Sequence, residues 1–123
     1  MVFSDQTYSV LVVSAAQKFN EAFAEMLPGS EYYPVRFVGN IAAARREMVN
    51  KTYDLVIINA PLPDEFGHEL CMDAVASTDA GVVFLVKAAQ AEQLLAPLNE
   101  QGVLLLSKPF SNTLFVQAMH MAA

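Results

Sequence analysis

The sequence predicts a single α/β domain in which five parallel strands alternate with five helices. Short apolar runs recur along the whole chain, and the segments between them carry apolar residues at helical spacing. The connections between these segments are short. Strands that alternate with crossover helices form a parallel sheet with helices on both faces.

The predicted strands are the apolar runs. Four are nearly continuous in apolar residues, the pattern of a strand covered on both faces. The second run is introduced by Pro34 and interrupted by Arg36, and both residues favour an edge position. In chain order, the predicted strands are Tyr8–Val13, Val35–Val38, Asp54–Ile58, Val82–Val86 and Val103–Leu106.

The first two helices follow from spacing and stop signals. Apolar residues between Phe19 and Leu27 recur three and four positions apart, and the pair Pro28–Gly29 ends that pattern. Asn40 is a suitable N-cap for the second helix. We expect this helix to bury Ile41, Ala44, Met48 and Val49.

The last three helices are predicted in the same way. The third covers about His68–Ser77 and turns Cys71 inward. The fourth contains Pro97, which is expected to kink or shorten it. Ser111 can cap the fifth, whose inner face carries Leu114, Phe115, Ala118 and Met119. This helix runs to Ala123 without a glycine or basic cap. Such an end suits a native terminus or a parent protein that continues into an output domain, and both alternatives stay open.

Composition limits the classes of function. We assign residues 1–123 to one domain, and no apolar run approaches the roughly 18 residues of a membrane span. The one cysteine, Cys71, excludes an internal disulfide and suits a reducing cytoplasm. The net charge of −6 repels phosphate backbones, so we expect no direct nucleic-acid binding by this chain. His68 and His120 lack metal-ligand spacing, and no phosphate-binding loop suggests a flavin, so no metal or cofactor is expected.

For five strands and this length, the flavodoxin-like (βα)₅ fold with doubly wound strand order 2-1-3-4-5 is the natural arrangement. In such a sheet, the binding site lies beyond the carboxyl ends of the strands. The residues at those ends are Ser14, Ala15, Asn59, Lys87 and Lys108.

Three stretches around these positions resemble the receiver domains of response regulators in two-component systems. Asp54–Asn59 is similar to the family's strand into the phosphoacceptor. Asn59 to Pro63, with Gly67 beyond, keeps the family's acceptor-to-proline spacing and closing glycine. Ser107–Phe110 resembles the family's Lys-Pro-Phe motif. The three stretches are in register within a likeness that covers essentially the whole chain.

The departures from this family are concentrated in its chemical positions. Ser14 and Ala15 stand where receivers carry the acidic pair that chelates Mg²⁺, and Asn59 stands at the phosphoacceptor aspartate. Lys87 replaces the phosphoryl-binding Thr or Ser, and Leu105 replaces the switch aromatic. Of the five chemical positions only Lys108 is kept, which indicates a pseudo-receiver with no catalytic residue. An amide is a poor nucleophile, so the step to an aspartyl phosphate would fail at its first atom.

The expected function is therefore phosphorylation-independent, through dimerisation or partner docking. The resemblance implies a homodimer face made of the fourth helix, fifth strand and fifth helix, with the tail Met119–Met121. It also implies transcription regulation through an output domain, which is either an RNA-binding antiterminator (ANTAR) module, the favoured alternative, or a DNA-binding domain. An anion or small metabolite bound at Lys87 and Lys108 is the first alternative. The second is Asp64 as a displaced phosphoacceptor or as a partner of those lysines.

Overall fold

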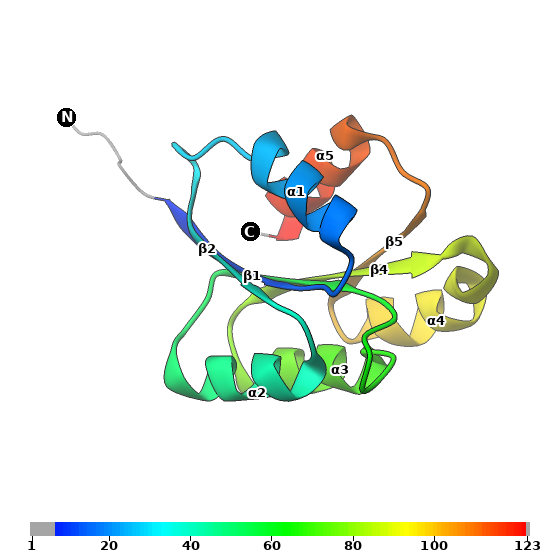
Figure 1. The fold of residues 1–123 in the computed structure, drawn as a ribbon. Coiled ribbons are helices and arrows are strands. Elements are labelled where there is room, and N and C mark those ends of the chain that lie inside the picture. Colours follow the sequence, from blue (N-terminus) through cyan, green and yellow to red (C-terminus); the bar gives the residue numbers. More distant parts are fainter. Residues whose placement is uncertain (1–6, 123) are drawn as a thin grey trace.

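The computed structural model describes residues 7–122, and its elements alternate as the sequence predicts. Figure 1 shows a central sheet with helices on both sides. The strands are β1 (Tyr8–Val13), β2 (Tyr32–Val38), β3 (Leu55–Asn59), β4 (Gly81–Lys87) and β5 (Val103–Lys108). The helices are α1 (Gln17–Met26), α2 (Ile41–Asn50), α3 (His68–Ser77), α4 (Ala88–Glu100) and α5 (Asn112–Ala122).

The sheet is parallel throughout, with the strand order β2-β1-β3-β4-β5. This order confirms the predicted flavodoxin-like fold. β2 is an edge strand, as its Pro34 and Arg36 indicate. It begins earlier than predicted, at Tyr32, so Pro34 lies inside the strand. An edge strand tolerates the missing N–H because one of its sides is unpaired.

Successive strand residues point to opposite faces of the sheet and build two separate cores. Leu11 and Val13 belong to the core under α2, α3 and α4, which contains Ile41 and Leu98. Val10 and Val12 belong to the core under α1 and α5. The two sides of the sheet are seen in Figure 1, with α1 and α5 above and the other helices below.

An aromatic cluster fills the core under α1 and α5. The rings of Phe23 and Phe115 lie 5.5 Å apart, and Phe110 lies 5.3 Å from Phe115. Phe19 completes the cluster at 6.2 Å from Phe115. Ring pairs at these distances gain about 0.5–1.5 kcal/mol beyond the burial of their area. The loop after β5 is thereby joined to the same core as α1.

Two predicted helix caps are confirmed. The side chain of Asn40 accepts a hydrogen bond from the N–H of Ala43 at 2.7 Å. The hydroxyl of Ser111 accepts from the N–H of Leu114 at 3.0 Å. Each contact satisfies an N–H group that the first turn of a helix leaves unpaired. The positions of α2 and α5 are therefore encoded locally.

The expectation for Val49 is wrong: its side chain is 85% exposed, although Ile41 and Ala44 are buried. At about 100° per residue, Val49 lies about 140° around the helix from Ala44, outside the buried stripe.

Of the two outcomes expected at Pro97, a kink or a shorter helix, the shorter helix is wrong and the kink stays a prediction. α4 extends to Glu100, and with 13 residues it is the longest helix described. Pro97 and Gln93 are both exposed. Because proline has no N–H, residue 97 donates no hydrogen bond to the carbonyl of Gln93. The exposed position of this carbonyl allows water to bind it instead.

Candidate functional site

The carboxyl edge of the sheet brings the sequence-predicted residues together. Ser14 follows β1, Asn59 ends β3, and Lys87 and Lys108 end β4 and β5. Lys87 and Lys108 are directly paired in the strand register. Ala15 lies on the loop after β1 and is exposed.

Ser14 and Asn59 form the buried centre of this edge. Ser14 is 2% exposed and Asn59 is 5% exposed, and they are the buried polar residues in the described part of the chain. The Nδ2 of Asn59 donates to the Oγ of Ser14 at 3.2 Å. The same Oγ accepts from the N–H of Ala16 at 3.2 Å. The hydroxyl is therefore already used by two donors.

Two contacts around Ser14 could not be predicted from the sequence. The main chain of Ser14 is held by its N–H, which donates to the carbonyl of Val38 at 2.9 Å. Its own carbonyl accepts from the Nδ2 of Asn20 at 3.3 Å. Asn20 carries no motif, and only the packing of α1 brings it to the end of β1.

One atom of this centre is left over. The Oδ1 of Asn59 is buried and accepts no hydrogen bond from any residue between 7 and 122. An acceptor that is buried without a donor costs about 1–3 kcal/mol. The free acceptor is the first group that a ligand with an N–H or O–H could engage here.

The ammonium group of Lys108 is bonded to the main chain of a loop and not to the amide of Asn59. Its Nζ donates to the carbonyl of Ala60 at 2.7 Å, so the β3–α3 loop holds the ammonium. Burial lowers the pKa of Lys108, and the nearby positive charge of Lys87 lowers it further. Within the described residues, neither lysine forms an ion pair with a carboxylate. The edge of the sheet is therefore locally positive in a chain whose net charge is −6.

Asp64, which the sequence analysis considered as a partner of the lysines, lies elsewhere. Its carboxylate accepts from the N–H of Ile41 at 2.9 Å and from the N–H of Ala42 at 3.0 Å. These bonds cap α2, and the Ile41 bond contributes most to the lowered pKa of Asp64. A carboxylate at a helix N-terminus also interacts favourably with the helix dipole. The pairing of Asp64 with the lysines, one of the alternatives that the sequence left open, is therefore not formed.

Leu105 is separated from this centre. It is half-buried on β5 and packs against the core under α3 and α4. With Ser107 of β5, and with Ala88 and Ala91 of α4, it lines a shallow hollow of about 310 Å³. An aliphatic side chain here has no hydroxyl or ring to exchange between two hydrogen-bonded positions.

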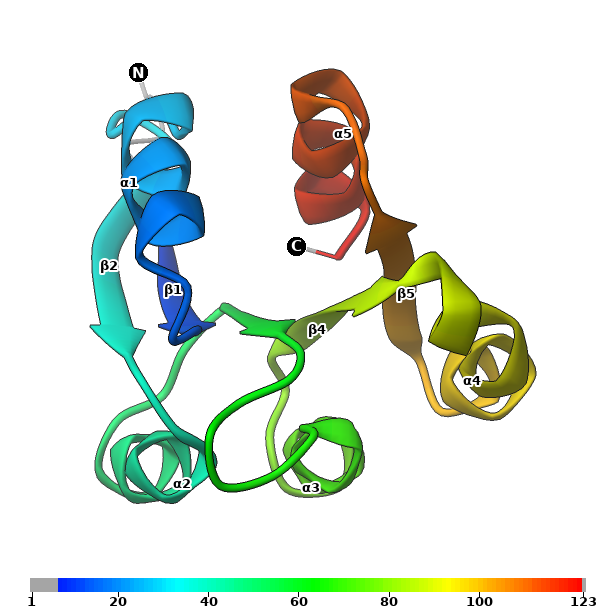
Figure 2. The ribbon, with the colours of Figure 1, turned by 45° about the vertical axis from the view of Figure 1, so that its right-hand side comes forward.

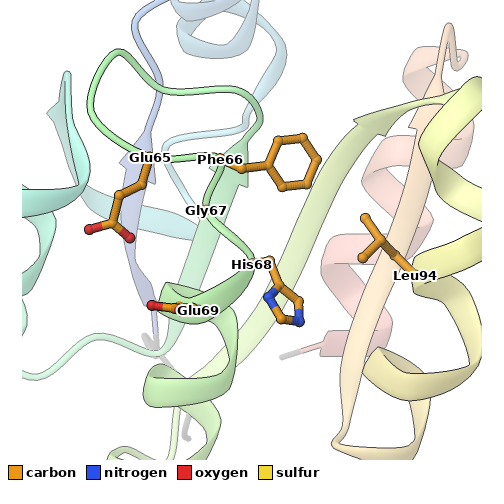
Figure 3. A pocket seen from close by; sticks show the side chains of 6 residues that line it. All are labelled: Glu65, Phe66, Gly67, His68, Glu69 and Leu94. Carbon is orange, nitrogen blue, oxygen red and sulfur yellow. The ribbon is translucent and has the colours of Figure 1, made fainter.

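A second hollow, of about 480 Å³, opens beside the loop that follows β3 (Figure 3). Phe66 faces it from the loop, His68 from the start of α3 and Leu94 from α4. Phe66 is fixed by an edge-on contact with Phe84 at a ring distance of 5.6 Å. His68 is thus a partly buried wall residue of a hollow that Glu65 and Glu69 also line.

The donor set at the carboxyl edge does not suit Mg²⁺, which prefers hard oxygen ligands and usually at least one carboxylate. Ala15 has no side-chain donor, Ser14 is engaged by two N–H groups, and Asn59 offers a neutral amide oxygen. Among residues 7–122, no three His, Cys, Asp or Glu side chains are grouped as metal ligands.

A family model described as "Response regulator receiver domain" matches residues 10–120. The chain belongs to this family. The receiver domain has the family's five-stranded parallel sheet. No curated protein sequence matches it. No helix between residues 7 and 122 is long and apolar enough to cross a membrane.

Solved structures resemble the receiver domain over nearly its whole length. One is a two-component response regulator from Clostridium difficile, 20% identical, with a TM-score of 0.80 over 95% of each chain. Another is the signal receiver domain of an HD domain-containing protein from Pseudomonas fluorescens, 19% identical, with a TM-score of 0.82 over 99% of this chain and 90% of that one. A third is the receiver domain of a sensor histidine kinase from Pseudomonas aeruginosa with a coordinated magnesium ion, 18% identical, with a TM-score of 0.75 over 95% of this chain and 98% of that one. At these identities, the likeness is one of fold.

Proposed function

We propose that this receiver domain is a pseudo-receiver: a signal-transduction module that works without phosphorylation, through dimerisation or partner docking, and catalyses no reaction. The carrying observation is the buried amide of Asn59 at the end of β3, bonded to Ser14. Asp64, the acid in the following loop, has both carboxylate oxygens engaged at α2. Of the described residues at this edge, neither Asn59 nor Asp64 therefore offers a free carboxylate as nucleophile or metal ligand.

The first test of this proposal is phosphorylation. The domain is incubated with Mg²⁺ and acetyl phosphate, alongside a conventional receiver, and the intact mass of each is measured. We expect the conventional receiver to gain a phosphoryl group and this domain to keep its mass. A gain of one phosphoryl group by this domain would overturn the proposal and direct attention to Asp64.

We further propose that the α4–β5–α5 face mediates a homodimer. Figure 2 shows β5 at the sheet edge, with α4 and α5 on opposite sides of it. On α5, Leu114 is 47% exposed and Met121 is 74% exposed. The two residues are seven positions apart and so share one face of the helix. Met119, which the sequence analysis counted with this face, is instead fully buried in the core.

Sedimentation velocity over a range of concentrations tests the dimer. We expect Met121→Lys and Leu114→Lys to weaken self-association, because each places a charge in an apolar contact. Val49→Lys is the matched control, since Val49 is exposed on α2, away from this face. An unchanged sedimentation coefficient at all concentrations would exclude the dimer and leave docking of a different protein. Equal effects of all three variants would exclude this face.

Regulation of transcription would then need an output domain beyond this receiver domain, of the RNA-binding antiterminator type that its resemblance favours. The net charge of −6 supports nucleic-acid contacts through that domain instead of through this one. A buried free thiol at Cys71 agrees with a reducing cytoplasm as the working compartment.

A second candidate function is the sensing of an anion at the carboxyl edge. Lys87 and Lys108 are register neighbours without a carboxylate partner in the described chain, and the Oδ1 of Asn59 lacks a donor. We expect phosphate or sulfate to raise the melting temperature above that in chloride of equal ionic strength. Lys87→Met should remove this effect, while Lys51→Met at the opposite edge should retain it. Identical melting in all three salts would exclude the candidate.

A further inference from the structure

A hollow of about 450 Å³ lies at the amino edge of the sheet, opposite the carboxyl edge that carries Ser14 and Asn59. Its walls come from the segment between α2 and β3, the segment between α3 and β4, and the start of β1. Asp54 immediately precedes β3 and Ala80 immediately precedes β4, so the hollow is bounded by the ends of two central strands. It belongs neither to the carboxyl edge nor to the α4–β5–α5 face.

The inner part of this hollow is apolar. Met48 of α2, Val56 of β3 and Ala80 contribute hydrocarbon surface, and the ring of Tyr53 stands beside them. Met48, Tyr53 and Ala80 are partly buried against the core under α2 and α3. A ligand that covers this apolar surface would gain about 25 cal/mol of binding free energy for each Å² removed from water. A ligand with an apolar body can therefore replace water at this floor.

Two polar groups of the wall, Asp54 and Thr78, are held in fixed positions by bonds to the protein. The Oδ2 of Asp54 accepts from the N–H of Ser9 at 2.8 Å and from the Oγ of Ser9 at 3.2 Å. The Oγ1 of Thr78 donates to the carbonyl of Ala74 at 2.6 Å and accepts from the N–H of Ala80 at 3.2 Å. A wall that is already ordered costs little further entropy when a ligand binds.

The charged groups of the hollow that have no partner among the described residues are negative. The lysine in its wall, Lys51, has its Nζ 3.7 Å from Glu47, which also accepts a hydrogen bond from the hydroxyl of Tyr53 at 2.6 Å. Asp79, by contrast, forms no hydrogen bond or ion pair through its carboxylate with any residue from 7 to 122. The bonds of Asp54 use only its Oδ2. Two carboxylates are thus left to face an incoming group.

We propose that this hollow binds a small organic cation: a primary amine on an aromatic or branched aliphatic body. The body lies on the floor made by Met48, Val56 and Ala80, and the ammonium lies between Asp54 and Asp79. Because the hollow joins the ends of β3 and β4, such a ligand would stabilise the receiver domain from the edge opposite Asn59. This site is independent of the proposed function.

The test uses three probes with one body and different charge: benzylamine, benzyl alcohol and benzoate. Each is titrated into ¹⁵N-labelled protein and followed by amide chemical shifts. We expect benzylamine to shift the amides of Tyr53, Asp54, Asp79 and Ala80. Benzyl alcohol should bind about two- to fivefold more weakly, the ratio expected for loss of an exposed charge interaction. Benzoate should bind more weakly still.

Two variants with the same change of charge locate the site. Asp79→Asn should weaken benzylamine binding about two- to fivefold. Glu25→Gln on the exposed surface of α1 should leave it unchanged. The proposal is overturned if the three probes bind equally, if the shifts fall elsewhere, if the two variants behave alike, or if benzylamine causes no shift.

Discussion

Gly67 offers the sharpest test of how the loop after Asn59 is packed. Its φ is +116°, a conformation that L side chains rarely adopt, and it stands immediately before α3. A Cβ at this position would lie 3.0 Å from the Cγ2 of Ile58 and 3.2 Å from the Cε1 of Phe84. Both of these side chains are fully buried, so neither can move away without disturbing the core.

The expected cost of Gly67→Ala has two parts. Backbone strain of a residue other than glycine at positive φ costs about 1–3 kcal/mol. Forcing a methyl group into a filled core costs about 1–3 kcal/mol more. We therefore expect Gly67→Ala to lower the free energy of unfolding by about 2–6 kcal/mol, a large share of the roughly 5–15 kcal/mol of a typical domain.

Two other glycines separate these contributions. Gly102 has a φ of +92°, and no atom lies within 4 Å of the place that an added methyl group would take, so Gly102→Ala should show only the backbone strain. Gly29 has open space and no positive φ, so Gly29→Ala should lie between no change and a gain of about 1 kcal/mol.

Urea unfolding followed by far-ultraviolet circular dichroism measures the series, since the chain has no tryptophan. The expected order of stability is Gly29→Ala, then Gly102→Ala, then Gly67→Ala. Equal losses for Gly67→Ala and Gly102→Ala would refute the close packing of Gly67 against Ile58 and Phe84. A loss for Gly29→Ala as large as the other two would refute the role of positive φ.

Four further outcomes are expected. Asn59→Asp places a carboxylate at the end of β3, but Ser14 and Ala15 still supply no acid for Mg²⁺. Acetyl phosphate should therefore leave the intact mass of this variant unchanged, and a gain of one phosphoryl group would contradict this. The N–H groups of Ile41 and Ala42 lower the pKa of Asp64 below its ordinary 3.8, so the carboxylate stabilises the fold above that pH and loses this effect as the pH falls through the lowered value. The melting difference between the wild type and Asp64→Asn should accordingly be largest near neutral pH and shrink below about pH 4. Burial, followed by the bond to Glu47, raises the pKa of Tyr53 from 10.0 to about 12. The contribution of the protonated Tyr53 to stability should be complete below pH 10 and lost as the pH rises to 12. Ultraviolet titration of the wild type against Tyr53→Phe measures the ionisation of Tyr53. Burial also raises the pKa of the Cys71 thiol, so a thiol reagent should react only after unfolding, and rapid reaction with the folded protein would contradict its burial.

The strands and the candidate site were predictable because their signals are local. A run such as Tyr8–Val13 is apolar enough to require cover on both faces, and Pro34 with Arg36 indicates an edge. The rule that sites lie at the carboxyl ends of parallel strands then brings Ser14, Asn59, Lys87 and Lys108 to one edge. The bond between Asn59 and Ser14 confirms that two of these residues are in contact.

Some predictions from helical spacing were wrong because spacing does not specify how wide the buried stripe is. Val49 lies at the margin of that stripe on α2 and is exposed. Leu114, placed on the inner face of α5 by its spacing, is 47% exposed, whereas Met119 on the same predicted face is buried as expected. Pro97 does not shorten α4, because the carbonyl it deprives of a donor lies on an exposed part of the helix.

The sequence by itself determined the class of fold, the strand order and the presence of an amide, Asn59, at the end of the third strand, since each depends on residue type and order along the chain. Only the tertiary structure decided the partners of the remaining polar groups. Asp64 caps α2 from 23 residues away, and Lys108 donates to the carbonyl of Ala60 48 residues away. A side chain's type says which bonds it can form, but the choice among distant partners depends on which backbone groups the packed helices leave unpaired.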